Sequence, residues 1–293
     1  FSPRLTLRRK PAPCRRTECD LLTPVVCLQI DAFADRPYSG NPAAVCLLEE
    51  ERDGPWMQAV AAEMNLSETA FVRRAGDGFD LRWFTPAVEV DLCGHATLAA
   101  AHALWSEDRA PGDDEIRFRT RSGVLTAARQ GNLIELDFPA TAPGPANLAV
   151  EQISTLGNAL GVEPEVVARS KFDLLVVVGS EDIVRGLQPD FKRLRELASR
   201  GVIVTSKSGD PGFDFVSRFF APGVGVDEDP VTGSAHCCLG PYWSERLGKS
   251  GMTAFQASPR GGVVHVRVSG ERVLLGGNAV TVFKGELTRA ATA

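Results

Sequence analysis

The sequence has no apolar run that approaches the roughly 18 to 20 residues a membrane-spanning helix needs. It also has no excess of positive charge, because 32 lysines and arginines are outnumbered by 37 aspartates and glutamates, for a net charge of −5. A net negative charge disfavours binding to nucleic acid or to an anionic membrane surface. These absences predict a protein that spans no membrane and binds no nucleic acid.

Sequence motifs for nucleotides and metals are also missing. The pattern G-x-G-x-x-G after a strand, which marks dinucleotide-binding folds, does not occur. Residues 248–250 resemble the end of a phosphate loop, but Trp243 stands where the first glycine of that loop must be. His95 and His102 lie two helical turns apart, about 10.5 Å by helical rise, and no group of cysteines and histidines has zinc spacing. We therefore expect neither a dinucleotide nor a metal site.

Disulfide bonds are not expected either. Seven cysteines, an odd number, are scattered through a chain of 293 residues of which 44% are apolar. A chain of this length buries a core without disulfides, as one large domain or two ordinary ones. We interpret the cysteines as reduced thiols and expect a cytoplasmic protein.

Residues 1–24 differ in composition from the rest of the chain. They contain six basic and only two acidic side chains, and their prolines oppose helix formation. No apolar stretch suited to a signal peptide is present. We predict a disordered extension, with an expression remnant or an Arg-rich, acid-poor transit peptide as open alternatives.

The most informative positive feature is an internal repeat. Residues 82–91 (RWFTPAVEVD) are echoed by residues 218–227 (RFFAPGVGVD), and shortly afterwards Gly94-His95-Ala96 stands opposite Gly233-Ser234-Ala235. A repeat this long predicts two halves of like fold. Each copy ends at a turn that opens a helix, so two sets of free backbone N–H groups are expected around one cleft.

The helices after these turns are predicted to be buried. Residues 96–105 are apolar almost all round a helix, and residues 235–247 are similar. A helix without a polar face is buried. Because many strands are also predicted, we expect a curved sheet around each of the two helices.

The segment 139–145, with three prolines in seven residues, is the natural linker between the halves. We therefore expect a first half over 25–139, a second half over 146–278, and a terminal strand over 279–288 that returns to the first half. Apolar patterning and turn residues predict strands over 25–33, 43–48, 69–73, 79–84, 173–178, 202–205 and 213–220, β-rich segments over 115–138 and 254–283, and helices over 56–64, 148–160 and 191–200.

Four polar side chains are candidates for chemistry. Glu68 lies among apolar residues between a helix and a strand, and such a carboxylate suits proton transfer, although a solvated loop residue is the alternative. Asp229 precedes the second buried helix, where capping is the alternative function. His95 and Ser234 each follow a repeat glycine, and as isolated residues they too suit capping.

Five ordered motifs together resemble the PhzF-like isomerase family, and most closely the phenazine biosynthesis-like domain proteins. The resemblance runs from about residue 25 to 287 and leaves only the basic N-terminus outside. The motifs are residues 40–45 (GNPAAV), 65–71 (NLSETAF), 82–86 (RWFTP), 92–97 (LCGHAT) and 228–235 (EDPVTGSA).

This resemblance implies an α+β fold of the diaminopimelate epimerase-like class. Two pseudo-symmetric halves, each a curved mixed sheet around a central buried helix, would enclose a site in the cleft between them. The family likeness also implies a homodimer, and a reaction that needs no cofactor and no metal.

The resemblance further implies a role for each candidate residue. Glu68 would be the general acid/base that moves a proton between carbons of a small carboxylate-bearing substrate. His95, Asp229 and Ser234 would orient the substrate and handle a second proton. The substrate-binding positions would be Asn41 and the two helix starts, Gly94-His95 and Gly233-Ser234, whose N–H groups would hold the carboxylate.

Two other functions remain open from the residues. Amino-acid racemases on this fold resemble one another in using two opposed cysteines, but here Cys93 precedes Gly94 whereas Thr232 precedes Gly233. A two-base racemase is therefore disfavoured. A non-catalytic carboxylate-binding or regulatory protein is the alternative from another class, and Glu68 argues against it because a binder needs no acid/base.

Overall fold

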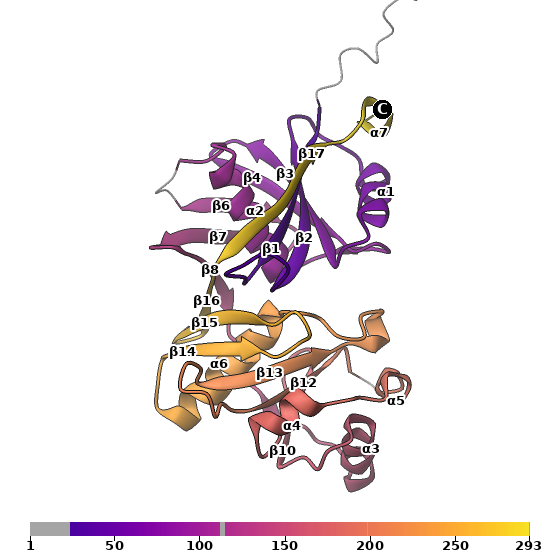
Figure 1. Ribbon diagram of the computed structural model, residues 1–293, viewed down its shortest axis with the longest axis vertical. Helices are drawn as coiled ribbons and strands as arrows, with labels where there is room; N and C mark the ends of the chain where they lie inside the picture. Colours follow the sequence, from indigo (N-terminus) through magenta and orange to yellow (C-terminus); the bar gives the residue numbers. More distant parts are fainter. Residues whose placement is uncertain (1–23, 112–114, 198, 293) are drawn as a thin grey trace, which may run out of the picture.

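The structure, a computed structural model, describes residues 24–111, 115–197 and 199–292. The predicted basic extension over 1–24 lies outside the described residues except for Pro24. Figure 1 shows two bodies arranged along the long axis of the molecule, each built from strands and a few helices. Among the described residues, no helix has the length and apolarity that crossing a bilayer requires.

The first body is a mixed sheet bent around one helix. Strand β2 pairs in parallel with β3, β3 pairs antiparallel with β4, and β4 pairs in parallel with β6, which continues into the antiparallel strands β7 and β8. The elements are β1 (Val26–Ala32), β2 (Asn41–Leu48), α1 (Gly54–Met64), β3 (Glu68–Ala75), β4 (Gly78–Phe84), β5 (Glu89–Val90), α2 (Gly94–Ser106), β6 (Ile116–Thr120), β7 (Gly123–Gln130) and β8 (Leu133–Pro139).

The second body repeats this order of pairing. Strands β11 and β12 are parallel, β12 and β13 antiparallel, β13 and β14 parallel, and β15 and β16 follow antiparallel. The elements are β9 (Gly144–Pro145), α3 (Val150–Leu160), β10 (Val166–Arg169), β11 (Leu174–Val177), α4 (Glu181–Gly186), α5 (Phe191–Arg195), β12 (Val202–Lys207), β13 (Phe215–Phe220), η2 (Pro222–Val224), α6 (Gly233–Leu247), β14 (Gly251–Gln256), β15 (Gly262–Ser269), β16 (Arg272–Gly277), β17 (Ala279–Glu286) and α7 (Arg289–Thr292).

The two bodies exchange their outer strands. β17 leaves the second body and pairs antiparallel with β1, as Figure 1 shows in yellow across the upper body. In the same way β9, which follows β8 of the first body along the chain, pairs antiparallel with β10. β8 and β16 pair with each other at the junction. These strand pairings, with further backbone hydrogen bonds such as that from the Gly40 N–H to the Gly261 carbonyl, join the halves.

The main core lies between each sheet and its central helix. The alanines of α2 from Ala96 to Ala103 are fully buried, and their small side chains let the strands approach the helix closely. In α6, a Cβ on Gly240 would lie 2.9 Å from Val266 Cγ1, so only glycine fits between this helix and β15. Smaller cores lie outside the sheets, beneath α1 in the first body and beneath α3 to α5 in the second.

One predicted helix is too long. A helix was expected over 191–200, but α5 ends at Arg195. The last turn tightens there, because the Glu196 N–H donates to the carbonyls of both Arg193 and Leu194. The chain then leaves the helix, and Arg200 pairs with Asp173 on the way into β12. The remaining predicted ranges differ from the observed ones by a few residues at their ends.

Candidate active site

Each body presents the first turn of its central helix to the other. α2 begins at Gly94 and α6 at Gly233, and a Cβ on Gly94 would lie 3.4 Å from Gly233 Cα. The cap residues Cys93 and Thr232 have extended backbones, and neither makes a side-chain cap hydrogen bond to a described residue. The N–H groups of both first turns are therefore available to one shared anion.

The repeated arginines hold the loops that lead to these helices. Arg82 donates from two nitrogens to Glu89, at 2.7 and 2.8 Å, and Arg218 donates in the same way to Glu228, at 2.7 and 2.8 Å. Bidentate pairs of this kind fix direction as well as distance. The arginine in each copy of the repeat thus has a structural function beside the site.

A carboxylate and an imidazole meet beside the helix starts. Glu68 is the first residue of β3, and its Oε2 lies 3.1 Å from His95 Nε2 in the first turn of α2. The Glu68 side chain is 18% exposed and that of His95 only 5%, so the pair is largely shielded and Glu68 keeps some contact with solvent. The contact lacks hydrogen-bond alignment, so neither atom has a hydrogen-bond partner among the described residues.

Asn41 joins the two bodies at this point. Its Nδ2 amino group lies 2.7 Å from Asp229 Oδ1, 2.9 Å from the Val231 carbonyl and 3.2 Å from His95 Nδ1. The group has two hydrogens, and the two shorter contacts, which both go to the second body, use them. We call Asn41, Glu68, His95 and Asp229 the acid–base cluster.

Asp229 is held from the other side by its own body. The Thr232 hydroxyl donates to Asp229 Oδ2 at 2.5 Å. The buried amide of Gln256 donates to the Asp229 carbonyl at 2.7 Å and accepts from the Thr232 N–H at 2.9 Å. Burial raises the pKa of Asp229 to about 6, while a charged His95 and the hydrogen bonds from Thr232 and Asn41 oppose that increase. Asp229 therefore titrates near neutral pH, where a proton-transfer group is effective.

The electrostatics of His95 favour its charged form. Burial opposes a charge on the ring, but Cys93 and Glu68 outweigh it and raise the pKa of His95 well above its ordinary value. Burial also raises the pKa of the Cys93 thiol to about 11. Because Cys93 therefore keeps its proton at neutral pH, the charge that stabilises the imidazolium is that of Glu68.

The ligand atoms of Glu68, Cys93 and His95 lie within 4.8 Å of one another, a spacing that a metal ion could use. However, Glu68 contacts Nε2 of the ring, whereas Cys93 Sγ lies 3.5 Å from Nδ1. The two groups flank opposite edges of the imidazole, and one ring nitrogen cannot bind a metal from both edges. This arrangement favours proton transfer over a three-ligand metal site.

Two surface hollows, of about 280 and 370 Å³, lie elsewhere, one along β14 and β15 and one between the linker and α6. The described residues that line them include no member of the acid–base cluster. Charged groups in the first hollow already form pairs, such as Arg267 with Glu135. We therefore place the candidate site at the facing helix starts, on its chemistry rather than on cavity size.

Comparison with known proteins identifies the family. The sequence model of the phenazine biosynthesis-like proteins matches residues 30–285. The chain belongs to the phenazine biosynthesis-like family. It is 52% identical over 258 residues to an uncharacterized isomerase of Halalkalibacterium halodurans, with coverage of 88% of this chain and 96% of the relative.

Solved structures confirm the fold class of this family member. A PhzF family protein of Enterococcus faecalis superimposes with a TM-score of 0.85 at 39% identity, covering 91% of this chain and 100% of the other. A predicted epimerase of Pseudomonas aeruginosa has a TM-score of 0.71 at 23% identity, covering 90% and 99%, and at that identity it speaks for the fold alone.

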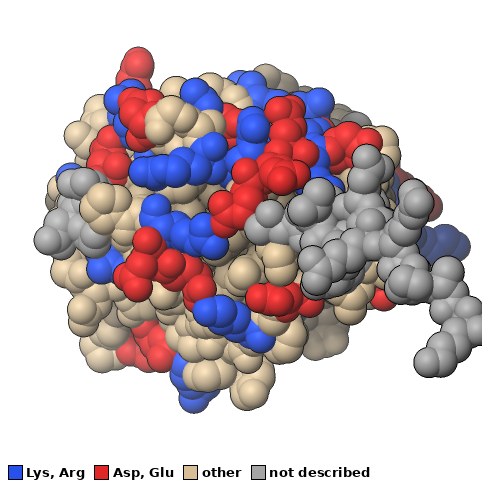
Figure 2. All heavy atoms as spheres, turned by 90° about the horizontal axis from the view of Figure 1, so that it is seen from above, with Lys and Arg blue, Asp and Glu red and all other residues tan. Residues whose placement is uncertain are grey.

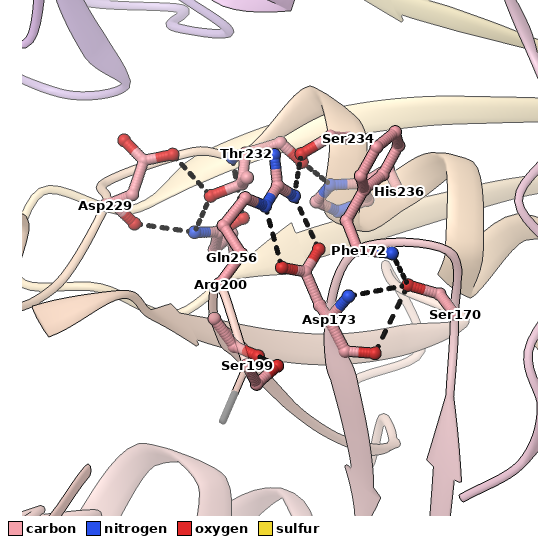
Figure 3. A network of polar contacts seen from close by, with 11 residues as sticks. Ser170, Phe172, Asp173, Ser199, Arg200, Asp229, Thr232, Ser234, His236 and Gln256 are labelled. Atoms are coloured by element: carbon pink, nitrogen blue, oxygen red, sulfur yellow. Dashed lines mark hydrogen bonds and ion pairs between the residues drawn. The ribbon is translucent and has the colours of Figure 1, made fainter. Parts of the chain in front are cut away.

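The structure brings Asn41, Glu68, His95 and Asp229 together, and it places the Ser234 hydroxyl against Arg200. Ser234 lies on the second-body side of the site, where its hydroxyl accepts a hydrogen bond of 2.9 Å from Arg200. Figure 3 shows Arg200 between Ser234 and Asp173, with Asp229 and Thr232 nearby. Gly94 and Gly233 meet directly, as described above.

Three site residues were missed by the sequence analysis: Arg200, Thr232 as a donor, and Gln256. Gln256 ends β14 and is fully buried, which is unusual for a glutamine unless both ends of its amide are bonded. Arg200 is the last residue of a segment that was expected to be helical. The only sequence signal for these residues is a polar side chain next to a predicted apolar strand. Many surface residues have the same pattern, so it does not single out a site residue.

Proposed function

We propose that this member of the phenazine biosynthesis-like family is an isomerase that moves a proton between carbons of a small carboxylate-bearing molecule. The observation that carries the proposal is the contact between Glu68 and His95 where the two uncapped helix starts meet. A carboxylate, an imidazole and paired N–H donors are the parts that proton transfer next to a carboxylate requires.

In the proposed reaction Glu68 takes the proton. The C–H bond next to the substrate carboxylate breaks, the proton goes to Glu68, and the electron pair moves onto the carboxylate oxygens. In a substrate with a C=C bond next to that carbon, the pair is shared across the double bond. The proton then forms a new C–H bond at the far carbon, directly from Glu68 or through Asp229, while the double bond shifts by one position, so that substrate and product have the same atoms. Because only a proton moves, the reaction needs no electron acceptor.

The helix starts supply stabilisation where the negative charge develops. A helix N-terminus carries about half a positive charge, and its interaction with an anion contributes typically 0.3–1 kcal/mol, up to about 2 kcal/mol in partly buried sites. Two termini that converge on one group act together on the enolate-like state. The charge on His95 lies adjacent to Glu68, on the same side of the site.

The molecular surface supports a small-molecule partner rather than a polyanion. Figure 2 shows basic and acidic side chains interspersed on the face viewed from above, with neither sign forming a continuous field among the described atoms there. Pairs such as Arg267 with Glu135 and Lys284 with Glu107 show the same mixing. We therefore propose that the substrate carboxylate is recognised at the facing helix starts and not on this face.

A two-cysteine racemase is a weaker interpretation of this geometry. Thr232 occupies the position of the second thiol, and its hydroxyl already donates to Asp229. Cys93 is protonated at neutral pH because burial raises the pKa of its thiol to about 11. A thiolate base would need the opposite shift.

The test is the substitution Glu68→Gln, which keeps the volume of the side chain but removes its ability to carry the proton. Wild-type protein and variant are incubated with a panel of small carboxylic acids in deuterated water, and deuterium bound to carbon is measured by mass spectrometry. We expect uptake and turnover in the wild type, and a loss of about 10²–10⁴-fold in the variant.

Glu63→Gln is the matched control, because Glu63 is an exposed residue of α1, five positions earlier in the chain. It should behave as the wild type. Near-wild-type rates in Glu68→Gln would remove Glu68 from the mechanism. Thermal stabilisation by a carboxylic acid without any deuterium uptake in the wild type would instead favour the binding-protein alternative.

A further inference from the structure

The two bodies place different chemistry next to equivalent positions, one residue out of register with each other. Thr69 and Val202 each pair with the phenylalanine that ends the repeated strand of their body, so they are equivalent. Glu68 stands immediately before Thr69, and Arg200 stands two residues before Val202. The first body therefore directs an acid, and the second body a cation, at its own central helix.

The residues that receive these groups are equivalent. His95 is the second residue of α2 and lies 3.1 Å from Glu68, whereas Ser234 is the second residue of α6 and lies 2.9 Å from Arg200. The two sides of the pseudo-symmetric site thus differ in chemistry. One side can move a proton, and the other side presents a guanidinium and a hydroxyl.

Arg200 is held in a fixed orientation. Its Nε and one terminal nitrogen donate to the two oxygens of Asp173, at 2.9 and 2.5 Å, and Asp173 is buried. The guanidinium carbon also lies 5.0 Å from the ring centre of Phe172 and 5.8 Å from that of Phe219. A guanidinium fixed by a bidentate pair and two rings loses little further freedom on binding a ligand.

Two donors on this side remain free. The Arg200 Nη1 group donates to no described residue, and Figure 3 shows it directed away from Asp173. Ser234 uses its oxygen to accept from Arg200, so its own O–H is free to donate. Across the site, Asn41 Oδ1 and His95 Nε2 are buried and have no hydrogen-bond partner among the described residues, which a bound molecule would supply.

We propose that Arg200 is a specificity-determining residue that, with Ser234, binds the anionic group of the substrate on the second-body side of the site. This inference rests on the proposed function and adds the orientation of the substrate in the site. The carboxylate of the substrate lies toward Arg200, and the carbon that loses its proton therefore lies toward Glu68. A substrate with a neutral group in place of that carboxylate is rejected.

The test measures anion binding without turnover, using succinate, inorganic sulfate and neutral succinamide as probes in thermal-shift and calorimetric titrations. Arg200→Lys removes the Nη1 donors but keeps a positive charge beside Asp173. The kept charge protects the fold, because the buried carboxylate of Asp173 is not left unpaired. We expect succinate or sulfate to bind the wild type, and Arg200→Lys to bind roughly ten- to hundred-fold more weakly, since charge-assisted hydrogen bonds have this strength. Ser234→Ala should weaken binding in the same direction.

The matched control is Arg195→Lys, because Arg195 is a more exposed arginine of α5 that pairs with Asp227. It should leave anion binding unchanged, and succinamide should bind none of the proteins well. Equal affinity of wild type and Arg200→Lys for both anions overturns the inference, as does a wild type that binds neither anion. Glu68→Gln separates the two proposals, since it should lose turnover and keep anion binding.

Discussion

Removal of the Asn41 side chain tests whether one amide organises the acid–base cluster. Asn41 lies at the start of β2 in the first body, fully buried, and its amino group donates across to Asp229 and to the Val231 carbonyl. Asn41→Ala removes both hydrogen bonds without adding bulk. Because the acceptors belong to the second body, the substitution also weakens the contact between the bodies at the site.

The magnitude follows from the two acceptors left behind. A buried polar group without its partner costs about 1–3 kcal/mol, so for two acceptors we expect a loss of roughly 2–6 kcal/mol in the free energy of unfolding. With an unfolding entropy of about 2.1 cal/mol/K per residue, that corresponds to a Tm lower by roughly 3–10 °C. Calorimetry measures the Tm, and chemical denaturation measures the free energy.

The same substitution should change the pH dependence of the reaction. The hydrogen bond from Asn41 lowers the pKa of Asp229, which burial raises to about 6. Without Asn41 that pKa rises further, so the limb of the pH–rate profile that belongs to Asp229 moves to higher pH. A merely structural role for Asn41 would lower stability but leave the limb in place.

Asn278→Ala is the control, because Asn278 also donates one hydrogen bond, to Asp35, but at an exposed position. It should cost less than about 1 kcal/mol, as surface contacts do. An unchanged Tm together with an unchanged pH limb in Asn41→Ala would refute the view that this amide holds His95 and Asp229 in place.

Three further predictions concern stability, chemistry and assembly. The folded state binds the proton of Asp229 more tightly than the unfolded state, since the pKa is about 6 rather than 3.8. The contribution of Asp229 to the free energy of unfolding therefore falls as pH rises from about 4 to about 6. If denaturation has the same pH slope in wild type and Asp229→Asn, this prediction is wrong. Cys93→Ser should retain most of the turnover because the thiol is protonated at neutral pH, and a loss of more than about a hundredfold would restore a thiol base. By family resemblance we propose a homodimer, so a sedimentation mass near the 31.4 kDa of a single chain would exclude it.

Local sequence predicted the parts that depend on neighbours along the chain. The repeat over 82–91 and 218–227 predicted two like bodies, and the alanine-rich segment after Gly94 predicted a buried helix; both follow from periodicity and composition, which adjacent residues determine. The motifs around Glu68, His95 and Asp229 supplied the candidate chemistry. The structure agrees with the first two, and it brings the three side chains to one place.

Only the tertiary structure determined which side chains of the site contact each other. Asn41 and Asp229 are 188 residues apart in sequence, and Arg200 meets Asp173 across 27 residues. These contacts depend on how strands pair and on where the two bodies meet, which no local pattern encodes. The end of α5 at Arg195 has the same origin, since a stretch with helical composition gives way to a tertiary ion pair. Sequence thus indicated Glu68, His95 and Asp229 as candidates, and the packing of one half against the other determined which side chains face each other.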